Sequence, residues 1–195
     1  MTYTEAYAHI DNLLDKAGTA YFIDEEKNQF LDLAVLEYTK GLINTLESDA
    51  QSMEKIAPLI VNSDPLVQAS GIITLPTSIP AYHILRAYTI SGYSINIMGY
   101  GEYASAKDNP FHKADTKNPI GLLRGAYMDV KGSIENIHVE YIKVPEVTHV
   151  AGENLGGYGV NSGEEIVNIA VRKMMLSLED PRYQLQINEL TAEKR

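Results

Sequence analysis

Hydrophobic residues in the first part of the chain recur at helical spacing. Tyrosine, alanine, isoleucine and leucine occur every three or four positions between residues 3 and 17, which predicts an amphipathic helix. Thr2 and Glu5 form a capping-box pattern in front of it, and Gly18 matches the glycine that often follows a helix. We therefore expect the chain to open with a helix of roughly four turns.

Two more helices are predicted before residue 58. The second begins after Asp24, a good N-cap residue, and the acidic Glu25 and Glu26 suit its positive end. Its predicted apolar stripe consists of Phe30, Leu33, Ala34, Tyr38, Leu42 and Leu46. A third helix is predicted over residues 48–57, because Pro58 disfavours helical backbone at the residue before it.

The middle of the chain has the composition of strands. Residues 71–75 form a short β-rich run, and residues 82–97 are rich in tyrosine, isoleucine and threonine, with a hairpin turn predicted at Ser91 and Gly92. Further strands are predicted over 122–130 and 134–144, with a short helix over 100–107 and a polar loop over 109–119.

The last part of the chain returns to helical spacing. Glycines between residues 151 and 161 predict a flexible loop, and Ser162 with Glu165 predicts a second capping box at the start of a helix. Asp180 as N-cap and Pro181 at the first helical position predict that a last helix follows. Asp180→Ala is therefore expected to cost about 1 kcal/mol of stability.

The order of these elements predicts an α+β fold, with N-terminal helices, a central antiparallel β region and two C-terminal helices. We expect a helical region at residues 1–62, a β-rich region at 63–150, and the glycine loop and last helices at 151–195. Together they are predicted to form one compact domain with a helical appendage, which 195 residues can build.

Composition narrows the classes of function. The chain has no cysteine, which excludes disulfides, thiolate nucleophiles and cysteine-ligated metals. No stretch is apolar enough to span a membrane, and the N-terminus lacks the basic segment of a signal peptide, so we expect a protein made in the cytoplasm. With 26 acidic and 16 basic side chains the net charge is −10, which disfavours non-specific binding to nucleic acid phosphates.

No pattern of catalytic or metal-binding residues is evident in the sequence. The five histidines form no ligand motif, and the glycines at 156, 157 and 159 lack the lysine and serine or threonine of a phosphate-binding loop. The 13 tyrosines are more typical of protein–protein contacts than of a nucleic-acid surface, because basic residues do not accompany them. We expect no enzyme activity, no cofactor and no metal.

The C-terminal third contains the run E-I-V at 165–167, A-V-R at 170–172 and L-E-D-P-R-Y at 178–183. In order and spacing, this run resembles the pattern of a family of ring proteins from the head-to-tail connector of crAss-like and related tailed phages of Bacteroidetes. Glu102-Tyr103 followed by Asn109-Pro110-Phe111 and Lys113 also resembles a family segment, as do Tyr21-Phe22 and the helix that holds Phe30, Leu31, Leu36 and Glu37.

The resemblance implies a structural protein of the virion that assembles in the cytoplasm of the host bacterium. It implies a homo-oligomer, a dodecameric ring, bound to the phage portal and to neighbouring connector or tail proteins. Genomic DNA would pass through it without sequence-specific binding, which fits the acidic net charge. An aromatic residue after Asn-Pro in a polar loop is expected to be a buried anchor. The interface candidates are Asn109, Pro110, Phe111, Asp180, Pro181, Arg182 and Tyr183.

Two alternatives remain open at this point. The chain could be another structural module of the same particle, such as a tail-completion protein, and density away from the portal would then mark its place. It could instead be a small-molecule binding protein that uses the β region and the glycine loop, in which case a purified monomer would bind a ligand saturably.

Overall fold

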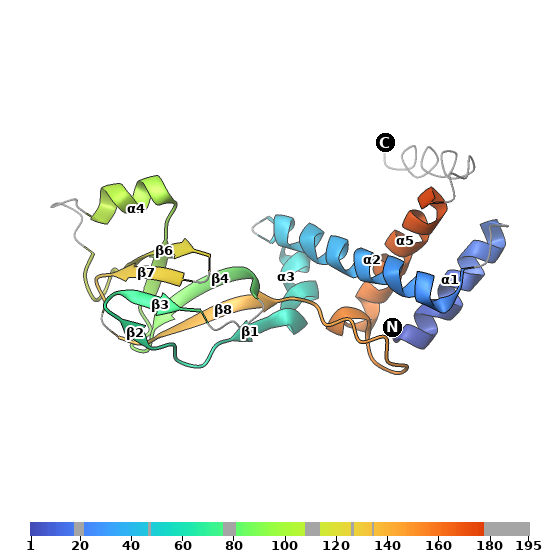
Figure 1. Cartoon of the computed structure of the whole chain (residues 1–195), viewed down its shortest axis with the longest axis horizontal. Helices are drawn as coiled ribbons and strands as arrows, with labels where there is room; N and C mark the ends of the chain where they lie inside the picture. The colour runs from blue at the N-terminus through green and yellow to red at the C-terminus, as the bar shows by residue number, and fades with distance from the viewer. Residues whose placement is uncertain are drawn as a thin grey trace. The chain divides into compact units, whose positions relative to one another are not determined.

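The protein has an α+β fold, as the sequence predicts (Figure 1). The computed structural model describes residues 1–17, 22–46, 48–75, 81–107, 114–125, 127–133 and 135–177. Contacts divide the chain into two compact units, one made of Met1–Pro58 with the chain from Pro145 onward, and one made of Leu59–Val144. The two terminal regions therefore build one helical unit together, and the divisions follow Pro58 and Val144 rather than residues 62 and 150.

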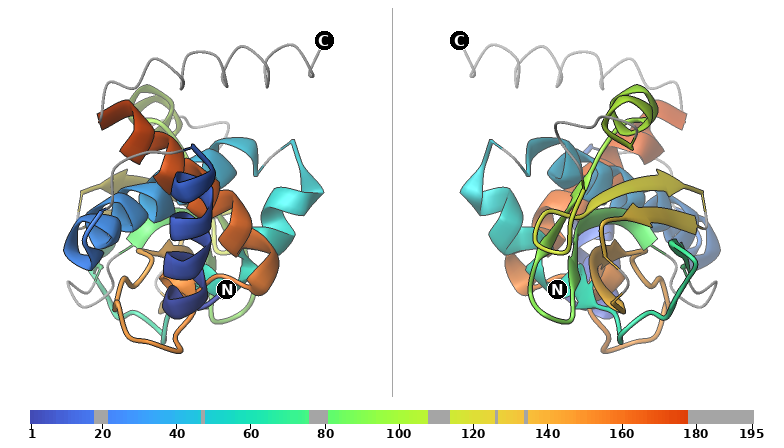
Figure 2. Two further views of the ribbon diagram at one scale, coloured as in Figure 1. Left: turned by 90° about the vertical axis from the view of Figure 1, so that its right-hand side faces the viewer. Right: turned by 90° about the vertical axis from the view of Figure 1, so that its left-hand side faces the viewer.

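Among the described residues, the helical unit is built from helices and one short turn. The elements are α1 (Tyr3–Ala17), α2 (Asp24–Thr45), α3 (Ala50–Ile56), a 3-10 turn η2 (Leu155–Gly157) and α5 (Val160–Ser177). Helix α5 packs against both α1 and α2, and α3 packs against α2 (Figure 2). A helix from the end of the chain thus holds the first two helices together.

Helix α1 begins as the capping box predicts. The Thr2 N–H donates to Glu5 Oε2 at 2.9 Å, and the Glu5 N–H donates to Thr2 Oγ1 at 3.3 Å. The Thr2 N–H and the Thr2 hydroxyl lower the pKa of Glu5, because hydrogen bonds to the carboxylate favour its charged form. Two backbone N–H groups that the helix cannot satisfy itself gain partners in this way.

The start of α2 differs from the prediction by one residue. Ile23 is the N-cap, in an extended conformation, and its N–H donates to Glu26 Oε2 at 3.1 Å. Asp24, which the sequence predicts as the cap, is already the first residue of the helix, and its carboxylate lies 3.4 Å from Lys27 Nζ instead. The prediction of Asp24 as N-cap is therefore wrong, and the reason is that Lys27 draws its carboxylate into an ion pair.

The buried stripe of α2 is also rotated relative to the prediction. Its apolar members are Leu31, Ala34, Val35, Tyr38 and Leu42. Leu33, which the sequence places in the stripe, is 52% exposed on the other side of the helix. The helix carries leucines on both sides, so its apolar spacing alone does not decide which side is buried.

Helix α3 has a side-chain cap, whereas the capping box predicted for α5 is wrong. Asp49 caps α3, since its carboxylate accepts the N–H groups of Gln51 at 3.0 Å and Ser52 at 3.2 Å. Helix α5 begins at Val160, so Ser162, the predicted cap, lies inside the first turn and is buried. Its N–H donates to the carbonyl of Gly159 at 3.2 Å, which shows that the helical pattern has already begun there.

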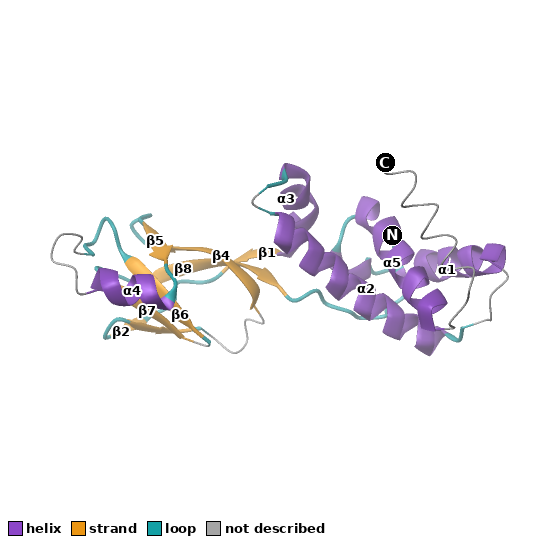
Figure 3. Ribbon diagram, turned by 90° about the horizontal axis from the view of Figure 1, so that it is seen from above, coloured by secondary structure: helices purple, strands orange, loops and turns teal. Residues whose placement is uncertain are grey.

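The second unit, Leu59–Val144, contains an eight-stranded sheet (Figure 3). Its strands are β1 (Ile60–Asn62), β2 (Gln68–Ala69), β3 (Ile72–Thr74), β4 (Ala81–Thr89), β5 (Ser94–Ile97), β6 (Ile120–Arg124), β7 (Tyr127–Lys131) and β8 (Ile137–Lys143). Their order is β1-β8-β4-β5-β6-β7-β3-β2. Neighbours run antiparallel except β5 and β6, which are parallel and are connected through α4 (Tyr100–Lys107). The sheet is therefore mixed, and the prediction of a purely antiparallel β region is wrong, because the helix between β5 and β6 lets the chain return in the same direction.

The segment between β1 and β2 adds to the pairing of the sheet. β1 and β2 lie at opposite ends of the strand order and follow each other along the chain. Between them, Leu66 pairs with Ile137 of β8 through hydrogen bonds of 2.7 and 3.1 Å, and Ser63 exchanges two hydrogen bonds of 2.9 Å with Val139. These pairs extend the hydrogen bonding along β8 beyond the end of β1.

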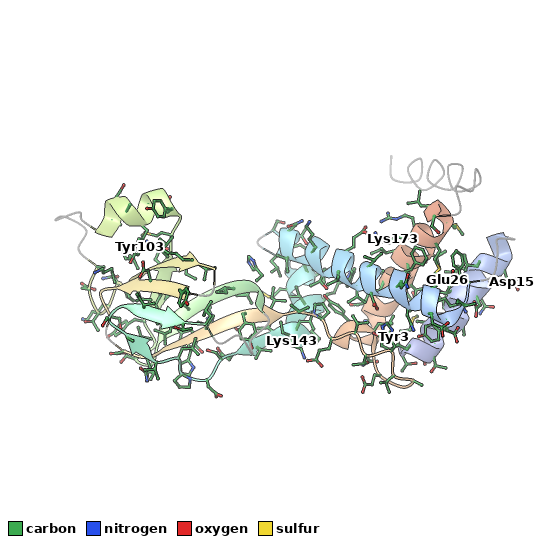
Figure 4. All side chains as sticks on the ribbon, viewed as in Figure 1. Tyr3, Asp15, Glu26, Tyr103, Lys143 and Lys173 are labelled. Carbon is green, nitrogen blue, oxygen red and sulfur yellow. The ribbon has the colours of Figure 1, made fainter. Side chains whose placement is uncertain are left out.

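The concave side of this sheet holds the core of the unit. The buried residues come from most of its strands and from the segment between β1 and β2: Leu66, Ile73, Ala87, Ile95, Met128, Val130, Ile137, Val139 and Tyr141. Full burial of one such side chain contributes roughly 1.5–3 kcal/mol. A second cluster lies under α4, where Tyr103 packs on Ile120 and Leu122 (Figure 4).

Two glycines with positive φ define hairpins in the sheet. Gly92, with φ +86°, lies in the predicted turn between β4 and β5, which is confirmed. Gly125, with φ +57°, ends β6 and allows the chain to return as β7. The single strand predicted over 122–130 is thus a hairpin, because glycine reaches this backbone region without the steric cost that other residues have.

Candidate functional site

All seven predicted interface residues lie outside the described residues. Asn109, Pro110 and Phe111 follow the end of α4, and Asp180, Pro181, Arg182 and Tyr183 follow the end of α5. Their roles therefore remain predictions from the sequence.

Other residues that carry the family resemblance lie in described parts of the chain, and there they stabilise the helical unit. On α5, Ile166 and Val167 are fully buried, and Glu165 lies 2.7 Å from Lys55 of α3. Arg172 of the same helix lies 2.9 Å from Glu37 of α2. Helix α5 thus uses its apolar residues for the core and its charged residues to join neighbouring helices.

Three polar residues from distant parts of the sequence meet in the helical unit. His149 Nε2, from the segment before η2, lies 3.3 Å from Asp32 Oδ1 of α2. The His149 ring centre lies 5.4 Å from that of Tyr3 on α1, whose side chain is buried (Figure 4). Burial raises the pKa of Asp32, and His149 opposes this increase. Burial and the Asp32 charge raise the pKa of Tyr3.

The chemistry of this cluster favours a structural role. A phenol with a raised pKa stays protonated at neutral pH and is a weak base and nucleophile. His149 has φ +55°, which is uncommon for a residue with a side chain and which holds its ring between the two helices. The sequence gives no sign of this cluster, because its three members lie on separate elements.

The other described histidines do not lie together as metal ligands would. His138 stacks on Tyr88 with ring centres 5.3 Å apart, and its Nδ1 lies 3.0 Å from the Ser63 carbonyl oxygen. His83 is exposed on β4, and His9 is half-buried on α1. Within the described ranges, no group of three or more histidine, aspartate or glutamate side chains could hold a metal ion.

The glycine loop is packed against α2 and does not form a phosphate cradle. Leu155 and Tyr158 are each 1% exposed, and Tyr158 OH lies 2.6 Å from Thr39 Oγ1. Gly156, with φ +58°, lies so close to Val35 that a Cβ atom would be 2.6 Å from its Cγ1. The flexible loop predicted here therefore contains a closely packed turn, and glycine is needed for that approach.

One outward face of the sheet unit has the composition of a protein interface. We call it the arginine–tyrosine face and define it as Ile72, Tyr100, Arg124, Tyr127 and Asp129. Strand register places Arg124 opposite Tyr127, and Ile72 opposite Asp129. The Arg124 guanidinium carbon lies 5.8 Å from the Tyr100 ring centre, and its Nη2 lies 3.3 Å from Asp129 Oδ2.

Three large side chains of this face, two aromatic and one aliphatic, are solvent-exposed. Tyr100 is 72% exposed, Tyr127 is 53% exposed and Ile72 is 47% exposed. Tyrosine and arginine dominate the energetic centres of protein interfaces, because they combine large apolar area with polar groups. The face is fixed by strand pairing, so little order has to be gained when a partner binds.

A second exposed surface lies on α2, opposite its buried stripe. We call it the outer α2 face and define it as Glu26, Gln29, Leu33, Leu36 and Lys40. These residues are all exposed and follow one another at intervals of three and four, which places them on one side of the helix. Such spacing around two leucines is typical of a seam between helices or subunits.

Charge is distributed unequally between the two units. Met1–Pro58 and the chain from Pro145 onward hold 19 of the 26 acidic and 9 of the 16 basic side chains, whereas Leu59–Val144 holds 7 of each. The net charge of −10 therefore belongs to the helical unit, and the sheet unit is neutral overall. An acidic body of this kind repels nucleic acid phosphates.

Comparison of the sequence with protein-family models gives no match, and comparison with curated proteins gives none. In the described part of the chain, no helix combines the length and hydropathy needed to cross a membrane.

Among the described residues, the two exposed faces are the strongest candidates for function, and neither was predicted from the sequence. The helical spacing of Leu33 and Leu36 was the available signal for one of them.

Proposed function

We propose that this chain is a structural ring protein of the head-to-tail connector of a tailed bacteriophage. In this role it joins the portal to the tail in a virion, lines part of the DNA conduit, and assembles in the host cytoplasm as a dodecameric homo-oligomer. The observation that carries the proposal is the ordered run from Glu165 to Tyr183, which resembles the connector family in both residues and spacing.

Two features of the molecule support this function. Two exposed tyrosines and the exposed Arg124 lie together on one face of the sheet unit, which suits a protein that acts through contacts with neighbours. Its net negative charge is confined to one unit, so that unit can border passing DNA without adsorbing the phosphate backbone. Identical weak contacts repeated around a ring add up through effective concentration.

Truncation tests the proposal directly. A chain that lacks Pro181–Arg195 should fold but fail to enter virions, because the missing segment carries the predicted docking residues. The matched control lacks only residues 192–195 and should be incorporated normally. Mass spectrometry of purified particles measures incorporation, and thermal melting of both chains verifies that they fold. Normal incorporation of the longer truncation would contradict the docking role.

Localisation in the particle separates the main alternative. A tail-completion protein would also be found in virions, but its labelled density would lie away from the portal. Cryo-electron microscopy of particles that carry a tag on this chain should place the tag at the portal–tail junction if the connector proposal is correct. Absence of the chain from mature particles would overturn both structural functions.

A further inference from the structure

We propose that the arginine–tyrosine face of one copy of this chain docks against the outer α2 face of the next copy. The inference rests on the proposed function only in requiring that many copies assemble. It names the two surfaces that meet, and it makes the contact head-to-tail, since one surface belongs to the sheet unit and the other to the helical unit.

A ring needs two different surfaces on each subunit. A contact in which the same patch meets itself closes as a dimer, whereas a contact between unlike patches continues from copy to copy until the rotation closes. In the described part of the chain, each unit carries an exposed apolar surface of suitable composition: the arginine–tyrosine face on the sheet unit and the outer α2 face on the helical unit. Two unlike surfaces on separate units are what a head-to-tail contact requires.

The sheet side of the contact supplies the anchors. Tyr100 and Tyr127 are both exposed. The Tyr100 ring lies beside the Arg124 guanidinium, Tyr127 is the strand partner of Arg124, and Ile72 adds apolar area on the neighbouring strand. The Arg124 Nη2 atom lies 3.3 Å from Asp129 Oδ2, and the Arg124 side chain is 54% exposed. A guanidinium has five N–H donors, so it retains donors for a carboxylate of the partner.

The helical side supplies a complementary surface. Leu33 and Leu36 lie at its centre, where aromatic rings from another copy can cover them. Glu25 and Glu26 are exposed at the N-terminal end of the same helix and lie within the strongly acidic unit. Arg124 of a docked neighbour would meet these carboxylates, which matches the difference in net charge between the two units.

Charge also argues against contacts in which two copies meet through the same unit. Two copies that met through their helical units would bring together two bodies that each carry the full excess of negative charge. Two copies that met through their sheet units would place Arg124 against Arg124. Contact between unlike units avoids both repulsions, and like-charge juxtaposition is a strong barrier to a wrong pairing.

Cysteine cross-linking tests the contact, because the natural chain contains no cysteine. A double variant, Leu36→Cys with Tyr127→Cys, should form a ladder of disulfide-linked multimers when the concentrated full-length protein is oxidised mildly. Each single variant can give at most a dimer. The matched control is Met53→Cys with Val67→Cys, two exposed positions in the same two units. We expect roughly tenfold more multimer from the first pair, because docking raises the effective concentration of its thiols.

Complementation gives an independent reading of the direction of the contact. Tyr127→Glu removes the sheet surface and leaves the outer α2 face intact, whereas Leu33→Glu does the reverse. Each variant alone should show no association by analytical ultracentrifugation, and a mixture should contain a one-to-one dimer joined through the two intact surfaces. Both substitutions are at exposed positions, so both variants should melt like the wild type.

The outcomes separate this inference from the connector function. A ladder no stronger than the control pair, or a disulfide within a single copy, overturns the head-to-tail contact even if the chain enters virions normally. A strong ladder together with absence from virions supports the contact and overturns the connector function. Association of the two variants with themselves would show that another surface joins the copies.

Discussion

The Nε2 atom of His149 lies 3.3 Å from Oδ1 of Asp32, and this pair connects the segment before η2 to helix α2. Tyr3 of α1 packs against the same imidazole ring. The residues come from three segments that only the folded unit brings together. Because burial raises the pKa of Asp32, the pair gives the helical unit a dependence on pH.

Substitution of Asp32 should reveal that dependence. A carboxyl group whose folded pKa lies above its unfolded value, here 3.8, binds more protons in the folded state. Its stabilising contribution is present below the unfolded pKa and is lost as the pH rises through the folded pKa. The asparagine in Asp32→Asn does not titrate, whereas the wild type loses stability as the pH rises. The melting temperature of the variant relative to the wild type should therefore increase between about pH 3 and pH 7.

Thermal melting in a series of buffers measures this difference. The matched control is Asp15→Asn, an exposed carboxylate on α1 (Figure 4). The upward trend for Asp32→Asn should exceed the trend for this control. A downward trend would mean that the attraction of His149 outweighs the burial of Asp32, which reverses the assignment of the dominant effect.

Lys27 is the most deeply buried charge among the described residues of the helical unit, and its partners should control stability. Its side chain is 1% exposed, and Nζ lies 2.7 Å from Asp11 Oδ1 and 3.4 Å from Asp24 Oδ1. Asp11→Asn should lower the free energy of unfolding by about 1–3 kcal/mol, because the buried ammonium loses its nearest counter-charge. Urea unfolding measures the loss.

A second substitution should recover part of that loss. In Asp11→Asn with Lys27→Met, the buried position is apolar and needs no counter-charge, so the double variant should be more stable than Asp11→Asn alone. As a control, Lys55→Ala should cost less than about 1 kcal/mol, because its pair with Glu165 is largely exposed. A double variant less stable than Asp11→Asn would show that the pair stabilises the fold beyond charge compensation.

The confirmed predictions concern elements fixed by neighbouring residues. The cap of α1 by Thr2 and Glu5, the turn at Gly92 and helix α4 all follow from local chemistry. The errors have tertiary causes. Asp24 does not cap α2, because its carboxylate pairs with the buried Lys27. Leu33 is exposed because α5 covers the other side of a helix with leucines on both sides.

The candidate surfaces were harder to predict than the fold. The arginine–tyrosine face joins residues of β3, α4, β6 and β7, and only the strand register places them on one side. The resemblance to connector proteins directed attention to residues 109–111 and 180–183, which lie outside the described residues. A family pattern marks residues that related sequences share, whereas an interface is a property of the folded surface.

Gly132 and Gly125 offer a matched test of close packing in the sheet unit. Both have positive φ, +93° and +57°, but a Cβ atom at Gly132 would lie 2.6 Å from the Asp115 carbonyl oxygen, whereas nothing lies within 4 Å at Gly125. Gly125→Ala should cost about 1 kcal/mol of stability from its backbone conformation. Gly132→Ala should cost about 2–4 kcal/mol, because backbone atoms must also move. Equal losses in urea unfolding would show that the backbone at Asp115 yields freely.

Tyr158 and Thr39 allow the buried contact between the glycine loop and α2 to be dissected. The Thr39 hydroxyl donates to the Val35 carbonyl at 2.7 Å, so at 2.6 Å it accepts a hydrogen bond from the Tyr158 hydroxyl. Tyr158→Phe should cost about 1 kcal/mol, because it removes that donor and leaves the ring packed. Thr39→Val should have a comparable effect.

The double variant decides whether the two hydroxyls act as a pair. If they do, Tyr158→Phe with Thr39→Val should cost less than the sum of the single losses, because the hydrogen bond between the two hydroxyls can be lost only once. Unfolding in urea with an unchanged m-value gives the three free energies on one scale. Strict additivity would mean that the loop is held by the packing of Leu155 and the Tyr158 ring alone, and the hydrogen bond would then contribute nothing to its position.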